Sequence, residues 1–199
     1  MKRLKQSNSM RPDLAIAALI GVATLLCWWL LNRPVSAPPW PSEVGGFAFS
    51  PMHADQDPNR GEFPSVEQIA ADLDKISGQA RGIRTYTVES TMAELPQLAA
   101  ERGLELTLGA WLDKREDHNA AELLRLAEVY HANQHHVGRV IVGNETVLRG
   151  DLTVEQIITH IQNIKQDLNA PVGTAEPWHV WLAHPELADV VDFIGIHLL

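Results

Sequence analysis

The sequence GRVIVGNE, residues 138–145, decides which architecture we expect for the whole chain. Its centre is a β-branched run, residues 140–142, which is typical of a strand buried on both faces. Gly143, Asn144 and Glu145 follow this run directly. A carboxylate placed directly after such a strand lies at the carboxyl edge of a parallel sheet, where α/β folds keep their chemistry. The alternative for this segment alone is an ordinary polar turn.

The same layout recurs along the chain, because strand-like and helix-like segments alternate from residue 44 onward. Strict alternation predicts a parallel sheet with right-handed crossovers, either as an open doubly wound sheet or as a closed barrel. The other expected strands are 44–50, 83–87, 104–112, 171–175 and 190–198. The expected helices are 65–76, 91–102, 119–136, 153–168 and 178–184, and both Ser65 and Thr153 open capping-box signatures.

The composition argues against several classes of function. The net charge is −9 and the pI is about 5.4, so nucleic acid is not expected as a partner. Cys27 is the only cysteine and lies in the most apolar segment, so it indicates no disulfide framework. Nine histidines are dispersed, and the spacing of His131 and His135 lacks the glutamate of a zinc-protease helix. No metal and no cofactor is predicted, since the common phosphate-binding loops are also missing from the sequence.

The amino end has the pattern of a membrane anchor. Residues 14–31 carry no charge, and eighteen residues nearly span a hydrocarbon core about 30 Å thick. Four basic residues precede this run and only Arg33 follows closely, which places the amino terminus in the cytoplasm. A cleaved signal peptide is the alternative, but Pro38 directly follows the small residues 35–37 that resemble its cleavage site.

Four segments follow from this interpretation. They are a cytoplasmic basic tail (1–13), a transmembrane anchor (14–32), a proline-rich linker (33–43) and an α/β domain (44–199). The expected location is the inner (cytoplasmic) membrane, crossed once, with the α/β domain on the periplasmic or extracellular side. The lipid bilayer is therefore an expected partner.

Polar and aromatic side chains gather at the expected carboxyl ends of the strands. Aromatic faces mixed with hydrogen-bonding groups suit sugar rings, which offer apolar C–H faces surrounded by hydroxyls. The alternative for each aromatic residue is core packing. The residues at these ends are Ser50, His53, Tyr86, Trp111, Asp113, Asn144, Glu145, Glu176, Trp178 and His197, and we expect His197 to bind substrate.

These ends resemble the family-17 glycoside hydrolases, the β-1,3-glucanase group. The resemblance covers residues 44–199 and rests on GFAFSP, RTY, LGAWL, VGNE, TAEPW and VDFIGIHLL, in a combination similar to the bacterial branch. It implies a partial TIM (β/α)8 barrel of about six β/α units, after one N-terminal transmembrane helix. It also implies a β-glucan polysaccharide or oligosaccharide as substrate. Some members of that branch are joined to a membrane glycosyltransferase, which is a further expected partner.

The resemblance also implies roles for single residues. Glu145 matches the acid/base carboxyl, and Asn144 matches the residue that contacts the sugar hydroxyl beside the scissile carbon. Tyr86 corresponds to the tyrosine that lines the cleavage site. The groove positions that hold glucosyl units correspond to Trp111, Glu176 and Trp178.

The chain departs from the family at the expected nucleophile. That residue is a glutamate on the seventh strand, within a segment resembling ETGWPS, and residues 44–199 are fewer than the about 250 of a complete barrel. We therefore expect a truncated or partial gene product that lacks ordinary retaining activity. An open sheet with two edges also predicts poor solubility or self-association of residues 38–199.

Three interpretations of function remain open. The first is a membrane-tethered glycosidase that acts on β-1,3-glucan by a retaining mechanism, through hydrolysis or transglycosylation. The second is a non-catalytic glucan-binding or assembly module. The third is an inverting pair formed by Glu145 and Glu176, which would need the two carboxyl groups roughly 6.5–9.5 Å apart.

Overall fold

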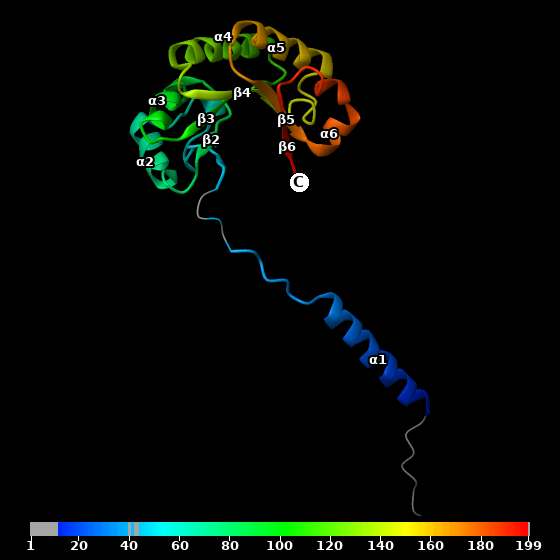
Figure 1. The fold of residues 1–199 in the computed structure, drawn as a ribbon. Coiled ribbons are helices and arrows are strands. Elements are labelled where there is room, and N and C mark those ends of the chain that lie inside the picture. The colour runs from blue at the N-terminus through cyan, green and yellow to red at the C-terminus, as the bar shows by residue number, and fades with distance from the viewer. Residues whose placement is uncertain (1–11, 40, 42–43, 199) are drawn as a thin grey trace, which may run out of the picture. The chain divides into compact units, whose positions relative to one another are not determined.

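The computed structural model of the protein describes residues 12–39, 41 and 44–198. It contains two compact units, Met1–Trp40 and Pro41–Leu199. The expected basic tail, residues 1–13, lies almost entirely outside the described residues, as do three positions near the end of the linker. Figure 1 shows the ribbon of both units.

The first unit consists mainly of helix α1, Pro12–Leu31. It begins two residues earlier than the expected anchor, with Pro12 at the first helical position, where the missing N–H of proline costs nothing. Its 20 residues correspond to a length of about 30 Å. None of these residues is buried, and the helix is long and apolar enough to cross a membrane, a test that a signal sequence near the amino terminus also passes.

The second unit is a six-stranded parallel sheet in which the strands follow one another in chain order. A doubly wound sheet would reverse its order at a switch point, so the sequential order identifies part of a barrel. Figure 1 shows the strands curving as about half of such a barrel. The strands are β1 Phe47–Ala48, β2 Gly82–Arg84, β3 Glu105–Ala110, β4 Val137–Asn144, β5 Val172–Pro177 and β6 Phe193–His197.

The helices of this unit cover the outer side of the curved sheet (Figure 1). Buried residues of both layers form one hydrophobic core, in which Leu108, Val140 and Ile157 have no exposed surface. This core holds the strands in register, so their carboxyl ends lie along one edge. The helices are α2 Val66–Ile76, α3 Leu95–Ala100, α4 Glu116–Asn133, α5 Val154–Asp167 and α6 Trp178–Ala183, with short 3-10 helices η1 Pro58–Arg60, η2 Ser90–Glu94 and η3 Pro185–Leu187.

One of the two predicted capping boxes is complete. Thr153 accepts the backbone N–H of Gln156, whose side chain accepts the backbone N–H of Thr153 in return. Ser65 accepts the N–H of Gln68 at 3.2 Å, but the Gln68 side chain donates instead to the carbonyl oxygen of Pro51 at 2.8 Å. Gln68 therefore anchors the loop that follows β1, a use that the local sequence does not reveal.

Several boundaries differ from the predictions. The first two strands are shorter than expected, since pairing of β1 with β2 is confined to two residue pairs. The second expected helix begins with the 3-10 helix η2, and α3 follows with Pro96 in its first turn, where proline is tolerated. The last strand starts at Phe193 instead of residue 190.

Candidate active site

The carboxyl end of β4 turns sharply and presents Glu145 at the edge of the sheet. Gly143 has φ 79° and Glu145 has φ 55°, a left-handed conformation that is uncommon for a non-glycine residue. The positive φ of Gly143 favours glycine there, and a Cβ would also meet Ile157 Cδ1 tightly, at 3.0 Å. The Glu145 N–H donates to the carbonyl oxygen of Ala175 at 2.8 Å and fixes the turn against β5. Backbone strain of this kind is concentrated at functional sites.

Glu145 lies in a cluster with three other polar side chains from three strands. Glu145 Oε1 is 2.5 Å from Nδ1 of His197, and its side chain keeps 24% of its surface exposed. His197 Nε2 is 3.1 Å from Nη1 of Arg84, and Nη2 of Arg84 donates to Oδ1 of Asn144 at 2.5 Å. The structure therefore brings together Asn144, Glu145 and His197, all of which are predicted site residues, through an arginine that no prediction singles out.

The electrostatics of the cluster are dominated by the half-buried Arg84. Desolvation by burial lowers the pKa of its guanidinium, while the neighbouring Tyr86 and Glu145 act in the opposite direction. Its Nε is buried with no hydrogen-bond partner among the described residues. A carboxyl group that is partly open to solvent and held by a neighbouring side chain can take part in general acid/base catalysis.

The expected role of Glu176, as a groove residue that holds a glucosyl unit, requires a correction. It has no exposed surface, so its carboxylate has no face to offer to a sugar. The carboxylate accepts hydrogen bonds from the backbone N–H groups of Val147 (2.8 Å) and Leu148 (3.3 Å) and from the Thr146 hydroxyl (3.3 Å). Desolvation raises the pKa of Glu176, and these hydrogen bonds oppose that rise. Glu176 thus holds the loop that directly follows Glu145.

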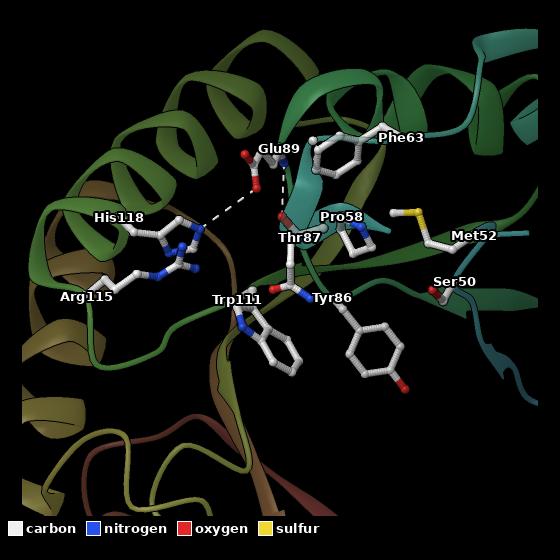
Figure 2. A pocket seen from close by; sticks show the side chains of 12 residues that line it. Ser50, Met52, Pro58, Phe63, Tyr86, Thr87, Glu89, Trp111, Arg115 and His118 are labelled. Carbon is white, nitrogen blue, oxygen red and sulfur yellow. Dashed lines mark hydrogen bonds and ion pairs between the residues drawn. The ribbon is translucent and has the colours of Figure 1, made fainter. Parts of the chain in front are cut away.

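Tyr86 and Trp111 form the wall of a cavity beside the cluster. The cavity has a volume of about 630 Å³. A guanidinium covers one face of each ring, with Arg84 at 4.9 Å from the Tyr86 centroid and Arg149 at 4.3 Å from the Trp111 centroid. In the view of Figure 2, the apolar side chain of Met52 lies toward the Tyr86 side of the cavity, and the polar side chains of Arg115 and His118 lie toward the Trp111 side. This mixed lining suits a sugar chain more than a purely apolar ligand.

A buried carboxylate on α4 holds this wall. Glu122 Oε1 accepts the backbone N–H of Val88 at 3.0 Å and that of Trp111 at 3.1 Å. Desolvation by burial raises the pKa of Glu122, while hydrogen bonds from Thr87, Val88 and Trp111 oppose that rise. Glu122 therefore joins the segments that follow β2 and β3.

The charged end of the cavity is an ion-pair network that the sequence analysis did not identify. Arg115 pairs with Asp113 at 2.5 Å, and His118 Nε2 lies 3.8 Å from Glu89 Oε2. Side-chain hydrogen bonding from Arg115 keeps the pKa of Asp113 below its usual range. Among the described residues, no group of three or more metal-ligating side chains could hold a metal ion.

Two other predicted residues make contacts with residues outside the cluster. Trp178 begins α6, is 49% exposed, and makes an edge contact with the ring of His179 at 5.6 Å between centroids. His53 Nε2 contacts Asp72 of α2 at 3.0 Å.

The cavity wall also contains residues that the sequence pattern does not single out. Met52, Pro58 and Phe63 come from the segment between β1 and α2. Its proline and glycine content showed a loop but gave no signal for the cavity.

Comparison with known proteins identifies the family of the domain. Residues 46–199 match the family model described as BtgE/BtgC glycoside hydrolase domain. A glucan 1,3-β-glucosidase of Arthroderma benhamiae is 28% identical over 123 residues, which cover 60% of this chain and 39% of that protein. A glucan 1,3-β-glucosidase of Schizosaccharomyces pombe is 28% identical over 147 residues, which cover 68% of this chain and 44% of that protein. The chain thus spans less than half the length of these relatives.

Solved structures share the fold. A family-17 β-1,3-glucanosyltransferase of Rhizomucor miehei superposes with a TM-score of 0.66 at 21% identity, over 77% of this chain and 56% of that one. An active-site mutant of the same enzyme, in complex with laminaritriose, gives the same values. A family-113 β-mannanase of Alicyclobacillus acidocaldarius superposes with a TM-score of 0.53 at 14% identity, over 77% of this chain and 59% of that one.

Proposed function

The chain belongs to the BtgE/BtgC glycoside hydrolase family, and on this premise we propose that it acts on β-1,3-glucan, with Glu145 as the acid/base. The observation that carries the proposal is the position of Glu145 at the carboxyl end of β4. It is partly exposed there and lies beside Asn144, His197 and an aromatic cavity. The named activities of the relatives point to β-1,3-linked glucose as the substrate class.

The proposed reaction is that of a retaining glycosidase. Protonated Glu145 gives its proton to the glycosidic oxygen while the bond from that oxygen to C1 breaks, and a second carboxylate forms the new bond to C1. The electron pair of the broken bond leaves with the oxygen, and the leaving glucan departs as an alcohol. Water, or a hydroxyl of another glucan, then attacks C1 and releases the second carboxylate, while its proton passes to Glu145. Water gives hydrolysis and a glucan gives transfer.

We place the second carboxylate outside the 199 residues. The alternative of an inverting pair with Glu176 is disfavoured, because Glu176 is fully buried and its carboxylate accepts hydrogen bonds from the loop after Glu145. An inverting mechanism would need that carboxylate to contact an attacking water. The 199-residue chain should therefore bind glucan without cleaving it, and cleavage should require a segment that supplies the nucleophile.

The experiment is a titration of the 199-residue chain, purified in detergent, with laminaritriose and with a β-1,4-linked trisaccharide of glucose. Intrinsic tryptophan fluorescence reports binding, and chromatography sizes the products. Preferred binding of laminaritriose without shorter or longer products is expected. Equal or no binding of the two sugars would overturn the substrate class. Products that Glu145→Gln abolishes would instead show that the nucleophile lies within the 199 residues.

We also propose that α1 tethers the domain to the inner membrane, with residues 44–199 on the periplasmic or extracellular side. The apolar helix and the basic residues before it support this orientation. A glucan chain produced by a membrane glycosyltransferase would then emerge on the same side as the domain, which makes such an enzyme the partner that we propose.

A further inference from the structure

We propose that His197 is a positioning residue that fixes Oε1 of Glu145, so that Oε2 is the oxygen that carries the catalytic proton. The inference rests on the proposed role of Glu145 as acid/base and deepens it. It replaces the expected substrate-binding role of His197 with a contact to the catalytic carboxyl. The argument uses the directions of two hydrogen bonds that meet on one imidazole ring.

The first step concerns Arg84. A guanidinium has only donors and remains protonated in proteins, so its 3.1 Å contact with Nε2 of His197 requires a lone pair on Nε2. Arg84 is held in this direction by its second hydrogen bond, from Nη2 to Oδ1 of Asn144 at 2.5 Å. Nε2 of His197 is consequently the unprotonated nitrogen.

The second step concerns the other ring nitrogen. A neutral imidazole with an unprotonated Nε2 carries its hydrogen on Nδ1. Nδ1 is 2.5 Å from Oε1 of Glu145, so His197 donates this hydrogen to the carboxylate. A hydrogen on Nε2 would point at the hydrogen of the Arg84 guanidinium, so the ring carries its hydrogen on Nδ1 alone. Arg84 therefore determines which nitrogen of His197 donates its hydrogen to Glu145.

The third step concerns the proton of the acid. Oε1 faces an N–H donor and accepts its hydrogen, so a proton on the Glu145 carboxyl must reside on Oε2. In the proposed reaction the Oε2–H bond breaks and its proton moves to the glycosidic oxygen, as that oxygen takes the electron pair of its bond to C1. The ionised carboxylate that results keeps the hydrogen bond from Nδ1 of His197. In the second step the incoming water or glucan hydroxyl returns a proton to Oε2.

The test is nitrogen NMR of the full chain in detergent, with ¹⁵N-labelled histidine. The His197 resonances are identified as those that His197→Asn removes. We expect one protonated and one unprotonated ring nitrogen at neutral pH, with the hydrogen on Nδ1 and its proton resonance shifted downfield by the short contact. In Glu145→Ala that proton resonance should move upfield. In Arg84→Met, which removes the donors and keeps a long apolar side chain, the unprotonated state should no longer be confined to Nε2.

Three results would overturn the inference. They are a hydrogen on Nε2 in the unmodified chain, a doubly protonated ring at neutral pH, or a tautomer that Arg84→Met leaves unchanged while the protein stays folded by circular dichroism. Laminaritriose binding is measured on the same samples. The expected tautomer without sugar binding would support the inferred hydrogen-bond directions and contradict the proposed function. A failure of the inference and a failure of the proposed function are therefore distinguishable.

Discussion

Glu122 of α4 accepts the backbone N–H of Trp111 at 3.1 Å, which ties the aromatic wall of the cavity to a buried carboxylate. The same oxygen accepts the N–H of Val88. One side chain thereby sets the position of two segments that follow different strands. The placement of Trp111 thus depends on a residue eleven positions further along the chain, on another element.

The variant Glu122→Ala should be strongly destabilised. It leaves two backbone donors without their partner, and each unsatisfied buried donor costs about 1–3 kcal/mol. Urea unfolding followed by circular dichroism measures the loss. Glu128→Ala, on the exposed face of the same helix, is the matched control and should change the free energy of unfolding by less than about 0.5 kcal/mol. Equal effects of the two variants would contradict the anchoring role of Glu122.

Removal of the Trp111 ring should weaken laminaritriose binding. The ring lines the cavity and is stacked by Arg149, so Trp111→Ala should lose roughly tenfold or more in affinity, which corresponds to about 1.4 kcal/mol. Fluorescence becomes unsuitable once Trp111 is absent, so isothermal titration calorimetry is the measurement. Trp178→Ala is the comparison, because Trp178 lies on α6 outside the Glu145 cluster. A larger loss for Trp178→Ala would move the sugar site toward α6.

The gathering of Asn144, Glu145 and His197 could be predicted because consecutive parallel strands bring their carboxyl ends to one edge. The sequence does not single out Arg84, because its contact with Asn144 spans sixty positions and depends on the register of the sheet. Glu122 looked like an ordinary polar helix residue. Its burial follows from the packing of α4 against the segments after β2 and β3, which local sequence does not encode.

Glu176 shows why the other part of the site escaped prediction. Every residue of β5 is buried, so the alternation that distinguishes one face of a strand from the other is missing from its sequence. A carboxylate at its carboxyl end could have faced the groove or the neighbouring loop. The hydrogen bonds that the carboxylate accepts from Val147 and Leu148 show that it faces the loop.

The edge strand β6 should promote self-association of the 199-residue chain. Ile194 and Ile196 are 46% and 50% exposed, and β6 pairs only with β5 among the described strands. Exposed apolar edges pair readily with other chains, and an edge lysine opposes such pairing. Sedimentation velocity in detergent should show less association for Ile194→Lys than for the unmodified chain, while Ile194→Val should behave like the latter. Unchanged association in Ile194→Lys would exclude this edge as the cause.

The orientation of α1 can be tested by cysteine labelling, because Cys27 is the only cysteine. In a Cys27→Ser background, Ala54→Cys introduces an exposed thiol in the domain and Ser7→Cys introduces one before the helix. A membrane-impermeant maleimide should label the Ala54→Cys variant on intact spheroplasts. It should label the Ser7→Cys variant only after permeabilisation. The reverse pattern would contradict the orientation proposed from the basic residues at the amino end.

The contribution of Glu176 to the stability of the domain should fall as the pH rises above the ordinary carboxyl range. Burial raises its folded-state pKa above the ordinary value of 4.5, so the folded protein binds more protons than the unfolded chain between those two values. The contribution is fully present below the unfolded pKa and is lost as the pH rises through the folded pKa. Glu122 contributes with the same sign.

Glu176→Gln isolates this contribution, because glutamine is nearly isosteric and does not titrate. Its side-chain oxygen can still accept one of the N–H groups of Val147 and Leu148. Thermal unfolding between about pH 4 and pH 8 should therefore show a smaller decrease for Glu176→Gln than for the unmodified chain. Asp192→Asn is the control, because the pH dependence of the Asp192 contribution has the opposite sign. Hydrogen bonding from Lys165 lowers the pKa of Asp192, so its contribution to stability is lost as the pH falls. A decrease that Glu176→Gln leaves unchanged would show that Glu176 is not the group whose protonation differs between the folded and unfolded states.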